Sequence, residues 1–542
     1  MGSEPAGEAG AVKSRPVARV GLALAPLLFG VVWLAPLPLE TPAHRLAAVF
    51  AAVVVLWVTE ALPIAVTALL IAPALVATGV TDAKSAFAPY ADPLLFLFVG
   101  GFFIARAMSR HGLDRRLATA LVTSRAVAGR AERVRLAFMV AGAALSMWIS
   151  NTATTAILLP ILLGTFDEGE EATGSVLAVA YACSIGGLGS LVGSPPNLIT
   201  ARFLQESGVA FGFVDWMAIG LPSAIVLLVL AHLFLRRLAP PRARAATREP
   251  AASESSAAST QPMPVPLTRR AARPLLPLAA LFALGPALAE VIELDLPTWA
   301  PEVGLGFAGA LFVIWAALFV AAPGSRWSRG ERVAALAFAM AVSGWMVPGL
   351  LKASGLEEGR ALAAALPGGG VALIAASVLF VLRDRRGERV LPWEDAAKID
   401  WGIIMLFGGG ISLGKQMVET GFAEAVSRGF VAATGLESLW ALTALVTVFT
   451  IFFTEVCSNT ASANMLVPIV IAVAQEMGVS PLPPALAVGL AASCAFMLPI
   501  ATGPNAIAYG TGRVPLPAMM RTGAGLNLIC AGAIVGLVWL LT

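Results

Sequence analysis

Long apolar runs alternate along the chain with short polar or basic connections, and most of these runs are long enough to cross a bilayer. A membrane-spanning helix needs roughly 20 predominantly apolar residues. On that measure the pattern predicts membrane segments at 18–38, 46–58 together with 62–80, 92–108, 175–190, 216–238, 275–292, 303–322, 333–351, 363–382, 400–416, 440–453, 486–500 and 523–541.

Polar positions inside these runs recur at a fixed distance. Ser150-Asn151-Thr152 returns as Ser458-Asn459-Thr460, an offset of 459 − 151 = 308 positions, and the same offset places the sequence GSPPN at 193–197 onto ATGPN at 501–505. This gapless agreement indicates a duplicated chain. Proline and glycine breaks at matching places in two membrane-embedded halves are the sequence pointer to the binding site of a transporter.

Composition supports a membrane protein. Hydrophobic residues make up 58% of the chain and charged residues 13%, against about half and about a quarter in soluble domains. The net charge of +3 does not point to a partner, and no basic cluster is interleaved with exposed aromatics as nucleic-acid binding would require. The four cysteines lack a C-x-x-C spacing, so we expect buried free thiols and neither a disulfide framework nor a zinc site.

The positions of the charges predict the topology. Lysine and arginine gather in cytoplasmic loops, and here they gather in the N-terminal tail, 106–135, 236–273, 326–332 and 383–398. The intervening segments are acidic or nearly neutral: 40–45, 290–302 and 419–437. We therefore expect a multi-pass protein of the cytoplasmic (inner) membrane with its N-terminus inside and its C-terminus outside. A cleaved signal sequence at 18–38 is the alternative, because a basic stretch precedes it.

The domain organisation follows from this count. We expect an N-terminal tail and first helix (1–45), a first repeat (46–239) with a hairpin near 133–163, a cytoplasmic linker (240–272), an additional helix pair (273–322) and a second repeat (333–542) with a hairpin near 440–472. If the Asn151 region re-enters the membrane, an odd number of crossings precedes the linker, and the second repeat is inverted. The predicted fold is an all-α polytopic membrane protein with two inverted repeats, each carrying a re-entrant helical hairpin and a broken helix.

The repeated motifs have a chemistry of their own. Irregular backbone survives at membrane depth only where it is buried in protein or lines a cavity, and a hairpin tip at each triplet would direct free N–H groups and the positive ends of helix dipoles at an anion. Prolines in the second motif interrupt a helix and free carbonyl groups. With neighbouring Ser, Thr and Asn oxygens, such carbonyls suit sodium, as in other broken transporter helices.

Other interpretations compete at single positions. Small polar residues also hold membrane helices together, although two copies at the same spacing favour a binding site. Glu60 and Glu455 are membrane-embedded carboxylates and therefore functional candidates, but both lie beside a predicted helix end, where capping is an equal alternative. Lys415 is expected to extend its ammonium to the membrane surface.

Enzymatic functions fit poorly, and we predict that the chain is not an enzyme. Gly410, Ser412 and Gly414 match G-x-S-x-G, but a nucleophile elbow needs a strand-to-helix turn and a base, and His232 is the one histidine inside a predicted span. Metalloprotease and nucleotide-binding motifs are missing from the sequence. An ion gradient, a substrate gradient or a partner ATPase must then supply the energy, and a channel remains an alternative.

At these residues the chain resembles the divalent anion/sodium symporters, which include di- and tricarboxylate and sulfate transporters. The resemblance covers roughly 46–239 and 333–542 and rests on both triplets, both proline motifs and the TEALP sequence at 59–63, which is similar to the early helix break of that family. It implies a homodimer with an elevator mechanism and a small dicarboxylate substrate such as succinate, malate or fumarate. A sodium-independent exchanger, a sulfate carrier and a citrate carrier stay open.

The resemblance also implies site residues. Substrate carboxylates would bind at Ser150, Asn151, Thr152, Ser194, Ser458, Asn459, Thr460 and Thr502. One sodium ion would bind at Ser146, Ser150, Asn151 and Gly193, and a second at Thr454, Cys457, Asn459 and Ala501. The chain departs from the family at Gly503, where a proline is usual, and because glycine has a freer backbone we expect altered substrate geometry or sodium affinity there.

Overall fold

The computed structural model describes residues 15–122, 131–163, 170–238, 327–353 and 367–542. Within these ranges every regular element is a helix, and the single β-bridge, between Arg383 and Arg389, is isolated. The all-α prediction is confirmed. The predicted linker (240–272) and the additional helix pair (273–322) lie outside the described residues.

The helices fall into two series. The first comprises α1 (Arg15–Leu34), α2 (Thr41–Thr59), α3 (Ile64–Ala77), α4 (Ala83–Phe87), α5 (Leu95–Arg110), α6 (Leu113–Val122), α7 (Ala131–Ser146), α8 (Asn151–Leu163), α9 (Glu170–Gly186), α10 (Pro195–Glu206) and α11 (Phe213–Leu238), with the 3₁₀ turns η1 (Ala88–Ala91) and η2 (Gly187–Gly189). The second comprises α15 (Arg329–Ala353), α17 (Gly368–Val381), α18 (Trp393–Ala396), α19 (Trp401–Glu419), α20 (Phe422–Thr434), α21 (Leu439–Thr454), α22 (Asn459–Glu476), α23 (Leu482–Ala491), α24 (Gly503–Gly510) and α25 (Leu516–Leu541).

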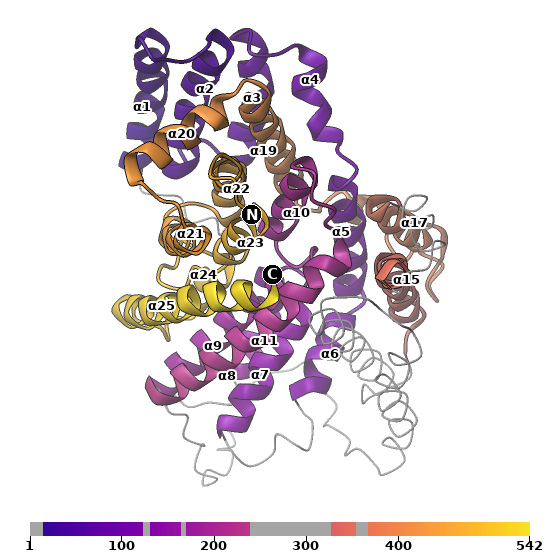
Figure 1. Ribbon diagram of the computed structural model, residues 1–542. Coiled ribbons are helices and arrows are strands. Elements are labelled where there is room, and N and C mark those ends of the chain that lie inside the picture. The colour runs from indigo at the N-terminus through magenta and orange to yellow at the C-terminus, as the bar shows by residue number, and fades with distance from the viewer. Residues whose placement is uncertain (1–14, 123–130, 164–169, 239–326, 354–366) are drawn as a thin grey trace.

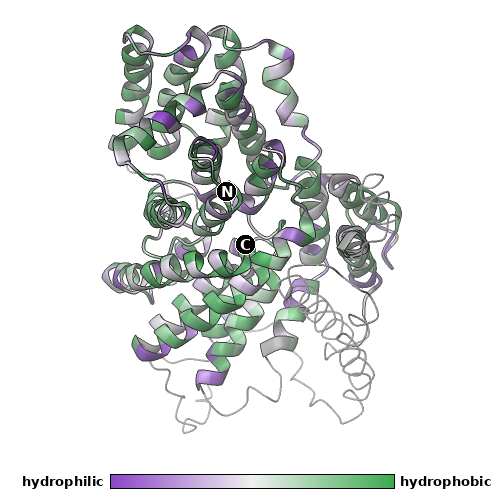
Figure 2. Cartoon of the chain, viewed as in Figure 1, coloured by the Kyte–Doolittle hydropathy of each residue, from purple (hydrophilic) through white to green (hydrophobic). Residues whose placement is uncertain are grey.

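Several of these helices have the dimensions of membrane spans. In the described part of the chain, six are long and apolar enough to cross a bilayer, among them Thr41–Thr59, Phe213–Leu238 and Leu516–Leu541. Figure 2 shows hydrophobic colour over most of the helical surface, with hydrophilic residues concentrated in loops and near helix ends. The prediction of a multi-pass membrane protein is confirmed.

Each helix series packs against the other. Helix α3 of the first series packs against α19 of the second, and α17 of the second series packs against α5 of the first. Phe98 of α5 and Phe407 of α19 close the core between them, with ring centroids 5.2 Å apart. In Figure 1 the short helices α10 and α24 lie in the middle of the molecule, where α10 packs against α22 and α23, and α24 packs against α8 and α9. This arrangement brings residues of both series to one central region.

The early helix break occurs where it was expected. Helix α2 ends at Thr59, and Glu60 adopts a left-handed conformation with φ of 48°, which is uncommon for a residue other than glycine. Pro63 then caps the start of α3. The chain therefore turns at 60–63 between two apolar helices.

Two predicted boundaries differ from the structure. The expected span at 486–500 is helical only up to Ala491, because the chain at 492–502 is irregular before α24 begins. The segment 419–437, expected as a connection, contains the 13-residue helix α20. Its apolar and polar faces alternate with the helical period, which is typical of an amphipathic helix and is easily missed by a search for continuous apolar runs.

Candidate functional site

Both repeated triplets lie where one helix ends and the next begins. Helix α7 ends at Ser146 and α8 begins at Asn151, while α21 ends at Thr454 and α22 begins at Asn459. The Ser146 hydroxyl donates to Asn151 Oδ1, and the Thr454 hydroxyl donates to Asn459 Oδ1 over 2.8 Å. Each hydroxyl therefore holds the side chain of its asparagine across the tip through the amide oxygen, and the amide nitrogen of each asparagine can only donate.

The proline motifs follow two stretches of irregular chain. Asn197 donates its amide hydrogens to the carbonyls of Gly187 and Ser190 at 2.8 and 2.7 Å. Asn505 donates to Ala495 and Leu498, both at 3.0 Å. Every partner is again 308 positions from its counterpart. Both asparagines are fully buried, and each ties together two carbonyls of a broken helix, where buried polar groups need hydrogen-bond partners.

Four helices begin at this place: α8, α10, α22 and α24. The prolines anticipated as breaks occupy the first turns of α10 and α24, where the missing N–H is no loss. At α24 the Thr502 hydroxyl caps the helix by accepting the Asn505 N–H at 3.2 Å. Helix starts carry a partial positive charge, so their convergence creates a region that favours an anion.

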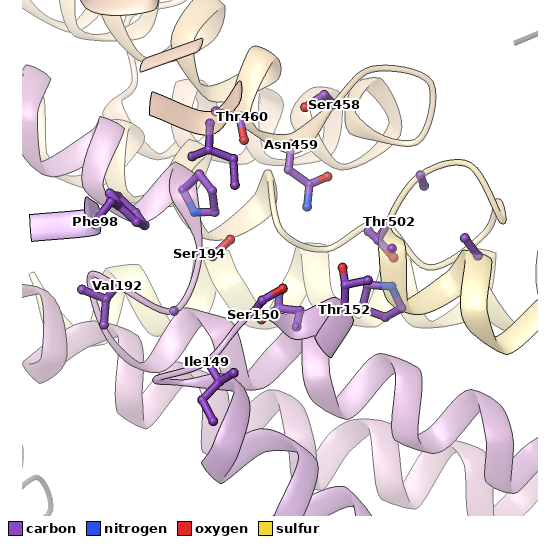
Figure 3. Close-up of a pocket in the computed structure, with 18 of the residues that line it drawn as sticks. Phe98, Ile149, Ser150, Thr152, Val192, Ser194, Ser458, Asn459, Thr460 and Thr502 are labelled. Carbon is purple, nitrogen blue, oxygen red and sulfur yellow. The ribbon is translucent and has the colours of Figure 1, made fainter. Parts of the chain in front are cut away.

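These elements enclose one cavity of about 380 Å³. All the residues predicted to bind substrate line it: Ser150, Asn151, Thr152, Ser194, Ser458, Asn459, Thr460 and Thr502. In Figure 3 the second triplet lies on one side of the open centre, Ser150 and Thr152 lie on the other, and Thr502 lies close to Thr152. Positions far apart in the sequence therefore form a single site.

Part of the lining was not anticipated. Phe98 and Phe102 of α5, Ile403 of α19 and Trp148 of the first tip contribute an apolar wall. In the sequence these are ordinary core positions of apolar helices, and nothing distinguishes them from other buried aromatics. Ligand cavities are commonly apolar with a few polar groups. Glu60 also lines the cavity, and neither lysine nor arginine is among its lining residues.

The two residue sets predicted for sodium are partly exposed to the cavity. Ser150, Asn151, Gly193, Asn459 and Ala501 line it, whereas Ser146, Thr454 and Cys457 lie buried behind the tips.

Around Gly187 the first set forms a tight cradle of polar atoms. A Cβ atom added to Gly187 would lie 2.8 Å from Asn151 Oδ1, 2.9 Å from Asn151 Nδ2 and 3.0 Å from the Gly193 carbonyl oxygen, so two oxygens and one amide nitrogen surround this point. Neutral oxygens of this kind suit a hard cation. No cluster of three or more His, Cys, Asp or Glu side chains able to hold a metal occurs in the described ranges.

Glu455 has a structural role. Its carboxylate accepts the backbone N–H groups of Phe496, Met497 and Leu498 at 2.7, 2.8 and 3.0 Å, and the Asn527 amide at 2.7 Å. It is 3% exposed and is not among the residues lining the cavity. Capping of the irregular chain is therefore the interpretation that the geometry favours.

The other residues considered as functional candidates, Lys415, Ser412 and His232, contact other protein groups. Lys415 pairs with Glu419 at 3.6 Å. The Ser412 hydroxyl is buried and donates to the Ala86 carbonyl at 2.8 Å, and His232 lies 3.7 Å from Glu132. Ser412 is thus engaged in helix packing and not held by a base. All four cysteines are buried and none forms a disulfide, as predicted.

The glycine at position 503 is explained by the lack of space for a side chain. Its φ is outside the left-handed region, so the backbone there does not require glycine. A Cβ atom at position 503 would instead lie 2.1 Å from Thr152 Oγ1. The close approach of two helix starts, which the sequence alone could not show, is what excludes a side chain.

The chain is similar over most of its length to known transporters. A citrate transporter family model matches residues 54–489 and, in a second match, 371–541. The chain is 30% identical over 542 residues to the sodium-dependent dicarboxylate transporter SdcS of Staphylococcus saprophyticus, covering 96% of this chain and 91% of that one. It is 32% identical over 501 residues to an uncharacterized transporter of Haemophilus influenzae, covering 91% of each. Among solved structures it is similar to the YdaH transporter of Alcanivorax borkumensis, with 17% identity, a TM-score of 0.46, and coverage of 84% and 85%.

Proposed function

The chain belongs to the citrate transporter family, and on that basis we propose that it is a secondary active transporter that carries small dicarboxylates together with sodium ions. Membership makes the protein a transporter and not an enzyme. The observation that carries the proposal is that both triplets and both proline motifs line one cavity. The relatives named as sodium-dependent dicarboxylate transporters support the same choice of cargo.

The substrate is a small dianion such as succinate, malate or fumarate. The starts of α8, α10, α22 and α24 surround the cavity, and helix starts attract negative charge. Hydroxyl and amide groups of Ser150, Asn151, Thr152, Ser194 and their counterparts in the second half donate to the two carboxylates. A cavity of about 380 Å³ is at the lower end of the usual range for small ligands.

Sodium supplies the positive charge that the lining lacks. One ion is held by Ser146, Ser150, Asn151 and Gly193, and a second by Thr454, Cys457, Asn459 and Ala501. The Asn151 side-chain oxygen and the Gly193 carbonyl oxygen, which lie close together beside Gly187, support the first assignment. Because each ion lies beside the dianion, binding of one favours binding of the other, and this mutual dependence couples the two movements.

Transport follows an elevator mechanism in a homodimer, with the hairpins re-entering the cytoplasmic membrane and the N-terminus inside. The composition of the lining supports the elevator: besides the tips and broken helices it includes Phe98 and Gly101 of α5 and Ile403 of α19, so the cavity lies at the boundary between two groups of helices. A site at such a boundary can move when one group of helices slides past its neighbour.

The second candidate is a carrier of citrate, which the description of the family favours. The exchange of dicarboxylates without sodium and the transport of sulfate are the other possibilities within transport.

The deciding experiment is uptake of labelled succinate into proteoliposomes that contain the purified protein. Three conditions are compared: an inward sodium gradient, a potassium gradient, and vesicles preloaded with unlabelled succinate. Accumulation that requires sodium supports symport. Uptake only into preloaded vesicles would show that the protein is an exchanger. Uptake of labelled citrate or sulfate but not of succinate would show that citrate or sulfate is the substrate.

A further inference from the structure

One corner of the cavity is formed by Thr152, the second residue of α8, and Gly503, the first residue of α24. A Cβ atom at position 503 would lie 2.1 Å from Thr152 Oγ1 and 2.9 Å from Thr152 Cγ2. Non-bonded carbon atoms are most stable at about 3.5–4.0 Å. Thr152 therefore occupies space that any residue with a side chain at 503 would need.

The corner related to it by the 308-residue offset is different. There the corresponding residues are Thr460 of α22 and Pro195 of α10, so a complete proline ring stands where Gly503 stands in the first corner. Thr460 is 7% exposed and Ser194, beside Pro195, is 2% exposed. In contrast, Thr152 is exposed and Thr502 is half-buried. The corner at Gly503 is thus the more open of the two, and its width depends on a contact that only glycine permits.

We propose that Gly503 determines the length of dianion that the cavity accepts, by letting Thr152 approach the start of α24. The inference rests on the proposed function and adds a residue that selects among its substrates. Thr152 belongs to the tip of the first hairpin, and Thr502 and Asn459 belong to the second series. The distance between Thr152 and α24 therefore sets the spacing of donors from opposite sides of the cavity (Figure 3).

The direction of the effect follows from the contact. A methyl group at 503 displaces Thr152 away from α24 and from Thr502, which widens the spacing between the two sets of donors. A four-carbon dianion then spans the site less well, whereas a dianion with one more methylene spans it better. One methylene in a close-fitting site changes relative affinity by about 10- to 200-fold, so a partial displacement is expected to change it by about fivefold or more.

The test uses Gly503→Ala and Gly503→Pro, with Gly510→Ala as the matched control. Gly510 is the last residue of the same helix, and a Cβ atom there would meet no atom within 4 Å. Malonate, succinate, glutarate and adipate compete with labelled succinate in proteoliposomes. The same four dianions are tested for their effect on the melting temperature of the purified protein, which reads binding without transport.

We expect both variants at 503 to shift the ratio of glutarate to succinate inhibition toward glutarate by about fivefold or more, while Gly510→Ala keeps the wild-type ratio. In a Thr152→Gly background residue 152 has no side chain left to clash, because the atoms that a Cβ at 503 would meet are Oγ1, Cγ2 and Cβ of Thr152, so adding Gly503→Ala shifts the ratio no further. An unchanged ratio in a folded Gly503→Ala protein overturns the inference. If the wild-type protein transports and binds none of the four dianions, the proposed function fails instead.

Discussion

The two broken helices at the cavity share one hydrogen-bond pattern but are held in place differently. In the first, around 187–194, the chain packs closely through glycines: a Cβ atom on Gly189 would lie 2.7 Å from Met147 Cγ, and one on Gly193 would lie 2.5 Å from the Gly187 carbonyl oxygen. In the second, around 495–502, Glu455 occupies the position equivalent to Met147, and its carboxylate accepts three consecutive N–H groups.

The difference shows that sterics and electrostatics can stabilise the same irregular backbone. Where glycine allows close contact, an apolar methionine fills the space against the turn. In the second half Ala495, Met497 and Ala501 stand in place of three glycines, and the carboxylate satisfies the exposed N–H groups instead. A buried carboxylate is favourable only when all its partners are present, so the second break is expected to be the more sensitive to substitution.

The largest effect is expected at Glu455. Replacing it by methionine gives the second half the residue of the first, but it leaves three N–H groups without an acceptor. We predict a loss of about 3–5 kcal/mol in the free energy of unfolding. Met147→Leu, which conserves volume, should cost less than about 1.5 kcal/mol. The measurement is denaturant-induced unfolding of purified protein in detergent, and equal losses in the two variants would contradict the comparison.

The tips are expected to behave alike, in contrast to the breaks. Asn151→Ala and Asn459→Ala each remove a donor to a charged substrate, worth about 1.5–3 kcal/mol, so the half-saturating succinate concentration should rise by about 10- to 100-fold in each. Asn464→Ala serves as control, because Asn464 lies in α22 and donates to the Leu406 carbonyl away from the cavity. Initial uptake rates at varied succinate give the values; an effect in one tip alone would show that the site is functionally one-sided.

A smaller and again equal effect is predicted at the asparagines of the proline motifs. Asn197→Ala and Asn505→Ala each remove two hydrogen bonds to buried carbonyls, of which the Ser190 and Leu498 carbonyls keep a backbone N–H donor, at a cost of about 1–3 kcal/mol. The losses in the free energy of unfolding of the two variants should agree within about 1 kcal/mol, which is the spread of the contributions of single hydrogen bonds. A much larger loss in Asn505→Ala would mean that Glu455 and Asn505 stabilise the second break as one unit.

The smallest effect concerns an ion pair that occurs on one side only. Arg202 of α10 forms ion pairs with Asp92 at 2.8 Å and with Glu206 at 3.0 Å. In the second half Gly510 is equivalent to Arg202 and Asp400 to Asp92. Asp400 instead caps α19 by accepting the Ile403 N–H. The Arg202 side chain is 26% exposed, so we expect Arg202→Gln to cost about 0.5–1 kcal/mol. High salt should reduce the difference from wild type, and a salt-independent loss would assign the effect to packing.

Local chemistry made much of the site predictable. Ser, Asn and Thr in the middle of apolar runs, and Pro195 and Pro504 at the ends of others, have few explanations other than helix breaks. The repetition at one offset then indicated that the positions belong together. Buried cysteines followed equally from their apolar neighbours.

Tertiary contacts account for what the sequence did not predict. The sequence placed Glu455 beside a break but could not show that three N–H groups from 41–43 residues further along would meet it. The approach of Thr152 to Gly503 joins residues 351 positions apart in the chain. Helix α20 was not predicted because its apolar face is discontinuous in sequence. Phe98 and Ile403 line the cavity only because α5 and α19 pack beside the tips.

Glu60 is the one ionisable side chain among the described residues that line the cavity, and the tips and proline motifs contribute none. A membrane potential acts on charge with about 2.3 kcal/mol per elementary charge per 100 mV. Because the protein's own charges return to their starting positions in a complete transport cycle, the current would equal the net charge of what is carried. Two sodium ions transported with one dianion would produce no current. With a third sodium ion, one net positive charge would enter in each cycle, driven by the negative interior, so a current measurement would give the number of sodium ions.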